Sequence, residues 1–391
     1  METTVYRRNN YLDWLRVLGI LTVFVYHSTR FFNMEYWHVK NVTWYPWVEV
    51  WNRFATSWML PLIFFISGAS LFYAVGKSQV SSFIKDKVLR LLVPLVVCDF
   101  THASWQVYLE QLSHGQFNGT YIQFIPRYFF DNFEWMGMHL WYLLALFLFC
   151  MILYPIMRWL MGRGQFVLSR LGDLLAIPGT VYALVLPTLL LSLVSDPANP
   201  VTELFAGWPL IIYLWITLAG FVVVSHEGLQ ASIQRLRWLS LPAGLVLVSS
   251  SIFLHGLGEG PAFGTARFAW GWALRSLGSW FCLLAILGFG IQHLNTRKPF
   301  LNYANEAVLP FYILHQTVLL SVGYIVLQWP MPDLLKWIVI MLVSFGIIMG
   351  FYEYLVRRFN LMRFLFGMKP KIPRPVLKTV EPVVEEVARI G

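Results

Sequence analysis

The chain has 391 residues, of which 58% are hydrophobic and only 13% are charged. Soluble domains carry about 25% charged residues, so this composition excludes an ordinary water-soluble fold and indicates that lipid covers much of the surface. The net charge of +9 would also fit a nucleic-acid-binding protein, but the distribution of the basic residues explains it as membrane orientation. We therefore expect no nucleic-acid partner.

Ten stretches are long and apolar enough to cross a bilayer, which takes about 20 mostly apolar residues. They are residues 11–32, 54–76, 88–110, 138–160, 174–195, 206–225, 238–257, 268–292, 303–328 and 334–356. The fifth contains Pro178 and Pro187 and is expected to be kinked. Gly68 in the second span, and Gly346 with Gly350 in the tenth, are small residues that favour close helix packing. The sequence thus predicts an all-α polytopic membrane protein with about ten transmembrane helices and two longer loops, at about 33–53 and 111–137.

Lysine and arginine alternate between the two sides of this arrangement. The N-terminus, every second connection and the C-terminal end are basic, whereas the connections between them contain few Lys and Arg. By the positive-inside rule both termini lie in the cytoplasm, which requires an even number of spans. We expect a multi-pass protein of the plasma (inner) membrane whose first span is an uncleaved signal anchor. Residues 1–358 would form one transmembrane domain, and residues 359–391 a flexible basic cytoplasmic tail.

Two ionisable residues of the first span, Arg16 and His27, are expected on one helical face. Eleven residues separate them, which is close to three full turns at about 100° per residue and a rise of about 16 Å. Ionisable groups within spans are costly and commonly functional, and Asp13 is close enough in the sequence to pair with Arg16. The alternatives are a snorkelling arginine and a histidine bonded to a neighbouring helix. Neither alternative explains why the two residues share a face.

Further polar residues fall at a similar depth in other spans. His139 opens the fourth span two residues before Trp141, His315 lies within the ninth and Arg275 within the eighth. We predict that these four residues line a pocket that brackets a hydroxyl-bearing acceptor, because a neutral imidazole can accept a proton from a hydroxyl. The alternative for each histidine is a hydrogen bond between helices. Arg275 would either hold an anionic group or pair with a backbone carbonyl.

On the cytoplasmic side, Lys87 and Arg90 lead into the third span and are spaced to bind one anion. Ordinary positive-inside anchoring is the alternative for this pair. The three cysteines, Cys98, Cys150 and Cys282, lie far apart in apolar runs, and no Cys/His spacing typical of a metal site occurs. We therefore expect no metal and no bound cofactor.

Several of these segments, in this order, resemble the acyltransferase 3 family of ten-span membrane enzymes. The resemblance covers about residues 9–358. Its motifs are Leu12-Asp-Trp-Leu-Arg16 with His27 following, Phe64-Phe-Ile-Ser-Gly68, the basic entry from Lys87 to Pro94, His139-Leu-Trp-Tyr-Leu143 and Tyr312-Ile-Leu-His315. Tyr36-Trp-His-Val39 and His139-Leu-Trp are most similar to the glucan biosynthesis type within this family, whose members are associated with succinylation of periplasmic glucans.

The resemblance implies an O-acyltransferase that moves an acetyl or succinyl group from cytoplasmic acyl-CoA to a hydroxyl of an extracytoplasmic carbohydrate. By motif position, His27 would be the essential histidine and Arg16 its partner arginine, with Asp13 paired to Arg16. His27 would act as general base in a ternary complex, or would itself carry the acyl group in a ping-pong route. The acceptor or the acyl group would occupy the pocket of His139, Trp141, Arg275 and His315. Arg16, Lys87 and Arg90 would bind the donor phosphates, although Lys87 departs from the arginine often found there. The partners would be acyl-CoA as co-substrate, a carbohydrate acceptor and the lipid bilayer. A homo-oligomer is compatible with the sequence.

The competing class is a proton-coupled transporter or flippase for a glycan or lipid, which ten spans and scattered histidines would also suit. Against this class, the sequence has no repeated half, no matching pair of broken helices and few carboxylates deep within spans. Incubation with labelled acyl-CoA separates the two classes, because only the acyltransferase would release free CoA.

Overall fold

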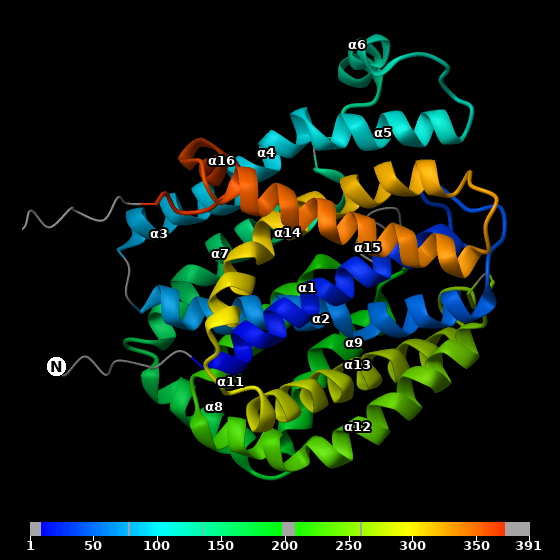
Figure 1. Cartoon of the computed structure of the whole chain (residues 1–391). Coiled ribbons are helices and arrows are strands. Elements are labelled where there is room, and N and C mark those ends of the chain that lie inside the picture. Colours follow the sequence, from blue (N-terminus) through cyan, green and yellow to red (C-terminus); the bar gives the residue numbers. More distant parts are fainter. Residues whose placement is uncertain (1–8, 77–78, 135, 198–207, 259, 372–391) are drawn as a thin grey trace, which may run out of the picture.

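The structure is a computed structural model that describes residues 9–76, 79–134, 136–197, 208–258 and 260–371. Within these ranges all regular structure is helical, and the long helices run side by side in one bundle (Figure 1). The first described helix begins, and the last one ends, towards the same end of this bundle (Figure 1). The all-α expectation is confirmed. The side of the membrane that this end faces remains a prediction.

The helices and helical turns of the first half extend from the described N-terminus to the middle of the chain. In order they are α1 (Asn10–Thr29), η1 (Arg30–Phe32), α2 (Pro46–Val75), α3 (Val80–Lys87), the π-helical turn η2 (Val88–Leu92), α4 (Val93–Phe100), α5 (His102–Ser113), α6 (Tyr121–Asp131), η3 (Met138–Leu140), α7 (Trp141–Leu160), α8 (Gln165–Ala176), η4 (Thr180–Leu184) and α9 (Val185–Val194).

The second half consists mainly of long helices, of which α12 packs along α13, and α14 packs against α1 and α15. In order its elements are α11 (Leu210–Val224), α12 (Glu227–His255), α13 (Ala266–His293), α14 (Pro299–Val326), α15 (Asp333–Phe351), the π-helical turn η5 (Tyr352–Val356) and α16 (Asn360–Leu365).

Among the described residues, six helical segments are long and apolar enough to cross a membrane. They are Pro46–Val75, Met138–Leu160, Glu227–His255, Ala266–His293, Pro299–Val326 and Asp333–Val356. Two further apolar segments, Thr180–Val194 and Leu210–Val224, are shorter. The helix of the first predicted span, α1, contains Asp13 and Arg16, and the third predicted span is broken at Thr101. The chain is therefore a multi-pass membrane protein, and the count of ten spans stays a prediction.

Helix α2 begins at Pro46, so the end of the predicted loop 33–53 is helical instead. Pro46 suits the first turn, where its missing N–H leaves no hydrogen bond unmade. Glu49 and Arg53 follow one turn apart and form an ion pair of 2.8 Å. Because each neutralises the other, the helix extends through two charged residues that hydropathy alone assigns to a loop.

Two of the predicted spans are interrupted. The third starts in the π-helical turn η2, and α4 and α5 meet at Thr101, whose backbone leaves the helical region. The fifth is broken between α8 and η4, at the segment that contains Pro178. This break confirms the disruption that the prolines predicted.

The predicted flexible tail, 359–391, begins with a packed helix, α16. The side chain of Arg363 in this helix is only 7% exposed and lies 2.9 Å from Glu306 of α14. The start of the tail is therefore anchored to the bundle by the ion pair of a buried arginine, which hydropathy does not reveal. Residues 372–391 lie outside the described residues. Cys98, Cys150 and Cys282 are free and buried.

Helices α2 and α11 touch at their backbones. A Cβ atom at Gly68 would overlap the carbonyl of Thr217, and one at Gly220 would overlap the carbonyl of Phe65. The close approach predicted for Gly68 is confirmed. The packing predicted for Gly346 and Gly350 is wrong within this chain. A Cβ atom added at Gly346 or Gly350 would have no described atom within 4 Å, apart from those of its own helix turn. This side of α15 therefore faces away from the other helices.

We expect Gly68→Ala to destabilise the protein by about 1–3 kcal/mol, because overpacking forces backbones apart. The matched control is Gly346→Ala, which makes the same change on a helix where the methyl group meets open space. Thermal unfolding in detergent should show a lower Tm for the first variant and an unchanged Tm for the second. Equal Tm values would contradict the backbone contact.

Candidate active site

A cavity of about 1180 Å³ opens between the helices. Its lining comes from α1, η1, the segment 35–38, α2, α5, residues 134 and 136–142, Pro197, α12, α13 and α14. It reaches the surface at Tyr36, whose side chain is 64% exposed. Four of the residues predicted for the site line this cavity, namely His27, His139, Trp141 and Arg275.

His27 is held in one orientation by two acceptors of its Nδ1 atom. Nδ1 lies 2.9 Å from the carbonyl oxygen of Val23, one turn earlier in α1. It also lies 3.2 Å from Nε2 of His315 in α14. A carbonyl can only accept, so the Nδ1 atom of His27 carries the proton. The Nε2 atom of His27 is then an unprotonated acceptor on a residue that lines the cavity.

His315 lies behind His27 and fixes it from α14. Its own Nδ1 donates to the carbonyl of Tyr312 at 2.6 Å, so its Nε2 is free to accept from His27. The His315 side chain is 1% exposed, and its ring centroid is 4.9 Å from that of His27. The alternative expectation for His315, a hydrogen bond between helices, is therefore what the structure shows. The same bond determines the protonation of His27.

His139 completes a cluster of three imidazoles. Its ring centroid is 4.8 Å from that of His315, and its Nε2 lies 3.2 Å from the carbonyl of Tyr312. The Tyr312 hydroxyl donates back to the carbonyl of His139 at 2.5 Å. His139 is 8% exposed, and its Nδ1 has no hydrogen-bond partner among the described residues. Buried polar atoms are rarely left unpaired, so this atom marks a place for a hydroxyl donor.

Arg275 lies between two indoles on another wall of the cavity. Its guanidinium is 4.5 Å from the ring centroid of Trp272 and 5.3 Å from that of Trp208. Stacking on aromatic rings suits the planar guanidinium.

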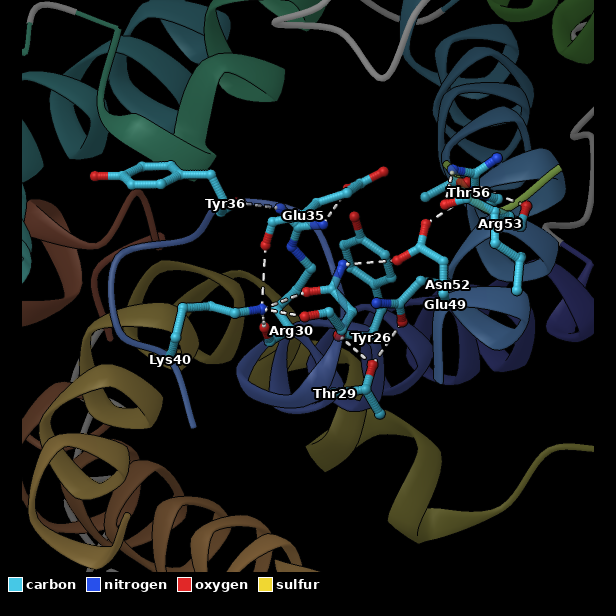
Figure 2. A network of polar contacts seen from close by, with 12 residues as sticks. Tyr26, Thr29, Arg30, Glu35, Tyr36, Lys40, Glu49, Asn52, Arg53 and Thr56 are labelled. Carbon is cyan, nitrogen blue, oxygen red and sulfur yellow. Dashed lines mark hydrogen bonds and ion pairs between the residues drawn. The ribbon is translucent and has the colours of Figure 1, made fainter. Parts of the chain in front are cut away.

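A polar network at the cavity mouth joins α1, η1 and α2 (Figure 2). Glu49 is fully buried and accepts from Arg53 at 2.8 Å and from Asn33 at 3.2 Å. Arg53 also donates to the carbonyls of Gly256 and Leu257, just after α12. One arginine therefore connects α2 to the end of α12 on this side of the cavity.

The loop after η1 is held by two basic residues in the same network (Figure 2). Arg30 pairs with Glu35 and donates to the carbonyl of Tyr36 at 2.8 Å. Lys40 donates to the carbonyls of Arg30 and Asn33 at 2.9 and 2.6 Å. These bonds give the 33–41 segment a fixed course past the cavity mouth.

Arg16 does not line the cavity. Its guanidinium donates to Asp13 at 2.8 Å, to Asn305 at 3.0 Å and to Ser70 at 2.5 Å. The pairing of Arg16 with Asp13 confirms that the two side chains meet. The guanidinium thus connects α1 with α2 and α14.

A pair of hydroxyl groups, one on α2 and one on α7, connects the neighbourhood of Arg16 with the cavity. Ser67 is one turn before Ser70, and its hydroxyl lies 2.6 Å from that of Tyr142, which lines the cavity. Residues three apart lie on the same side of a helix. Polar side chains of α2 therefore follow one line from Arg16 towards the cavity.

Lys87 and Arg90 lie at the π-helical turn η2 and not on one regular α-helix. The Lys87 ammonium is 3.5 Å from Asp86 and lies over the Phe83 ring at 5.1 Å. Arg90 is exposed, and neither residue lines the cavity. Their role in donor binding stays a prediction.

Sequence reasoning missed a second group of polar residues that line the cavity, namely His38, Glu110, Glu134 and Gln316. Three of them belong to predicted loops or span ends, where polar residues are unremarkable. The signal that singled out this region was the Tyr36-to-Val39 motif. Within the described residues, no group of three His, Cys, Asp or Glu side chains is arranged to hold a metal ion.

These features define a helical membrane protein with an oriented histidine in a large cavity. The chain matches the family described as an acyltransferase domain over residues 9–353. It therefore belongs to the acyltransferase 3 family and is a membrane acyltransferase, as the sequence motifs indicated.

Curated relatives of similar length share a low identity with the chain along nearly its whole length. "Glucans biosynthesis protein C" of Salmonella paratyphi A is 21% identical, with 93% of this chain and 96% of that protein aligned. The protein of the same name from Salmonella typhimurium is also 21% identical, over 95% of this chain and 98% of that protein. No solved structure shows a significant match.

Removal of the Arg53 guanidinium should leave the buried Glu49 carboxylate without its ion-pair partner. We expect Arg53→Met to lower stability by about 3–5 kcal/mol, the usual effect of breaking a buried ion pair. The double variant Glu49→Gln with Arg53→Met should regain part of this loss, because no uncompensated charge is then buried. Thermal unfolding in detergent measures both effects, and a double variant no more stable than Arg53→Met would contradict them.

Proposed function

We propose that the protein is an O-acyltransferase that uses His27 to transfer an acyl group from acyl-CoA to a carbohydrate hydroxyl. The observation that carries the proposal is the orientation of His27. Two acceptors at Nδ1 leave Nε2 as the basic atom of a residue that lines the cavity. The name of the relatives, glucans biosynthesis protein C, points to a glucan as the carbohydrate.

The chemistry then requires one base. The Nε2 atom of His27 takes the proton of the acceptor hydroxyl as its oxygen attacks the thioester carbon. The new oxygen–carbon bond forms, the carbon–sulfur bond breaks, and the proton passes to the departing thiolate. His315 holds the proton of His27 on Nδ1, so that the imidazole cannot adopt the tautomer that presents a donor to the hydroxyl.

The donor would approach from the end of α1 that contains Arg16. Phosphates of CoA bind well to guanidinium and ammonium groups, and Arg16, Lys87 and Arg90 are the cations expected there. The line from Ser70 through Ser67 to Tyr142 supports a path from Arg16 to the cavity. The phosphates would stay at Arg16 while the pantetheine arm extends towards His27.

The two substrates would then meet from opposite sides of the membrane. Acyl-CoA enters from the cytoplasm, where both termini lie, and the carbohydrate enters from the outside of an inner membrane through the cavity mouth. The acyl group is acetyl or succinyl. A succinyl group would place its free carboxylate on a cation, and Arg275 is the arginine on the cavity wall suited to that role.

We expect His27→Ala to lower acyl transfer by at least about 100-fold, the usual contribution of a general base. The assay follows the release of CoA from labelled acyl-CoA in the presence of a glucan, and unchanged donor binding shows that the fold is intact. His293→Ala, at the exposed end of α13, is the matched control and should retain full activity. Normal transfer by His27→Ala would remove His27 from the mechanism.

We expect Arg16→Ala to weaken CoA binding roughly tenfold or more, because hydrogen bonds between charged groups contribute about 1.5–3 kcal/mol. Arg16→Lys, which keeps the positive charge, should recover part of this affinity. CoA affinity is measured by equilibrium titration of the purified protein, beside its Tm. A lower Tm with unchanged CoA affinity would give Arg16 a structural role only.

A further inference from the structure

One side of the cavity contains a carboxylate that is held by two donors. Glu110 of α5 accepts from the Tyr36 hydroxyl at 2.5 Å and from Nδ1 of His38 at 2.6 Å, one donor on each oxygen. Its side chain remains 18% exposed. A carboxylate has about four lone-pair sites, so about two remain for a ligand.

His38 is itself fixed from behind by buried amides. The side-chain nitrogen of Gln316 donates to Nε2 of His38 at 3.2 Å and to Gln106 at 3.0 Å. Gln106 is fully buried and donates in turn to Thr317 at 2.8 Å. Because Gln316 adjoins His315 in α14, the carboxylate wall and the reacting imidazole are positioned by the same helix.

Glu134 adds a second carboxylate to the same wall. Its side chain lines the cavity, where partial desolvation and the charge of Glu110 raise its pKa. The Tyr36 hydroxyl stays protonated, because partial burial and the bond to Glu110 raise its pKa to about 12. The exposed ring of Tyr36 stacks on His114, with centroids 5.0 Å apart.

We infer that this wall, formed by Tyr36, His38, Glu110 and Glu134, is a subsite for a neutral carbohydrate whose hydroxyls donate to the two carboxylates. The subsite rests on the proposed function, because it gives the acceptor a place beside His27. A few fixed polar groups with an aromatic surface are the usual composition of a selective small-molecule site. His139 lines the same cavity, and its buried Nδ1 has no hydrogen-bond partner among the described residues.

The charge of the wall determines what it rejects. Two adjacent carboxylates repel phosphates and carboxylates, so the CoA end of the donor and an acidic saccharide are both disfavoured here. Hydroxyls carry no such penalty and can donate to either carboxylate. The cations Arg53 and Arg275 line the cavity as well, so the cavity offers an anionic group positions other than this wall.

The test is direct binding to the full-length protein in detergent, without donor. The probes are a neutral β-linked glucose oligomer and the matching oligomer of glucuronic acid. Wild type should bind the neutral oligomer more tightly. Glu134→Gln should weaken the binding of the neutral oligomer roughly tenfold, since a hydrogen bond to a charged group is lost. The ratio of the affinities for the neutral and the acidic oligomer should also become smaller.

Two further variants complete the test. Glu110→Gln should act in the same direction as Glu134→Gln. Because Glu110 also holds Tyr36 and His38, Glu134→Gln, which removes none of these bonds, is the decisive variant. Glu227→Gln, the same change at the exposed start of α12, is the control and should bind like wild type. Wild-type affinity in Glu134→Gln, or equal wild-type binding of both oligomers, overturns the subsite.

Acyl transfer is measured separately, so the two proposals can fail independently. If the oligomer binds with the expected preference but no CoA is released from acyl-CoA, the subsite stands and the proposed reaction fails. If transfer occurs and the acceptor KM is unchanged in Glu134→Gln and Glu110→Gln, the reaction stands and the subsite is wrong.

Discussion

The contact between the imidazoles of His27 and His315 is the interaction on which the site depends. It joins α1 to α14 within the bundle, where an unpaired polar ring would be costly. Each ring gives one nitrogen to a backbone carbonyl of its own helix, so both helices contribute to the position of the pair. The imidazole that we propose as the base is thereby set in one tautomer before any ligand arrives.

Helix α14 contributes polar side chains both to the histidine cluster around His27 and to the wall that contains His38. His315 faces His27, Gln316 fixes His38, and Tyr312 is bonded to His139 at two points. Asn305, earlier in the same helix, bonds Arg16. The residues that the sequence identified separately in the first, fourth and ninth spans are thus joined through a single helix. This is why a displacement of α14 would affect several groups at once.

The sequence predicted the helical class, the placement of most long helices and the residues that meet at His27, because these depend on hydropathy and on fixed motifs. It could not place Glu49 and Arg53 in a helix, since their charges cancel only when paired across one turn. The wall of Tyr36, His38, Glu110 and Glu134 could not be predicted from the sequence either. Glu110 and His38 are 72 positions apart, and a contact over that separation is set by the packing of α5 against α14 and not by local pattern.

The backbone contact between α2 and α11 has a consequence for motion. Where Gly68 and Gly220 bring two main chains together, there are no side-chain torsions to absorb a displacement, so the two helices move as one rigid body. Helix α2 forms much of one cavity wall and also bonds Arg16 through Ser70. Any widening of the cavity to admit or release a chain must therefore come from a displacement of its other walls relative to the pair formed by α2 and α11.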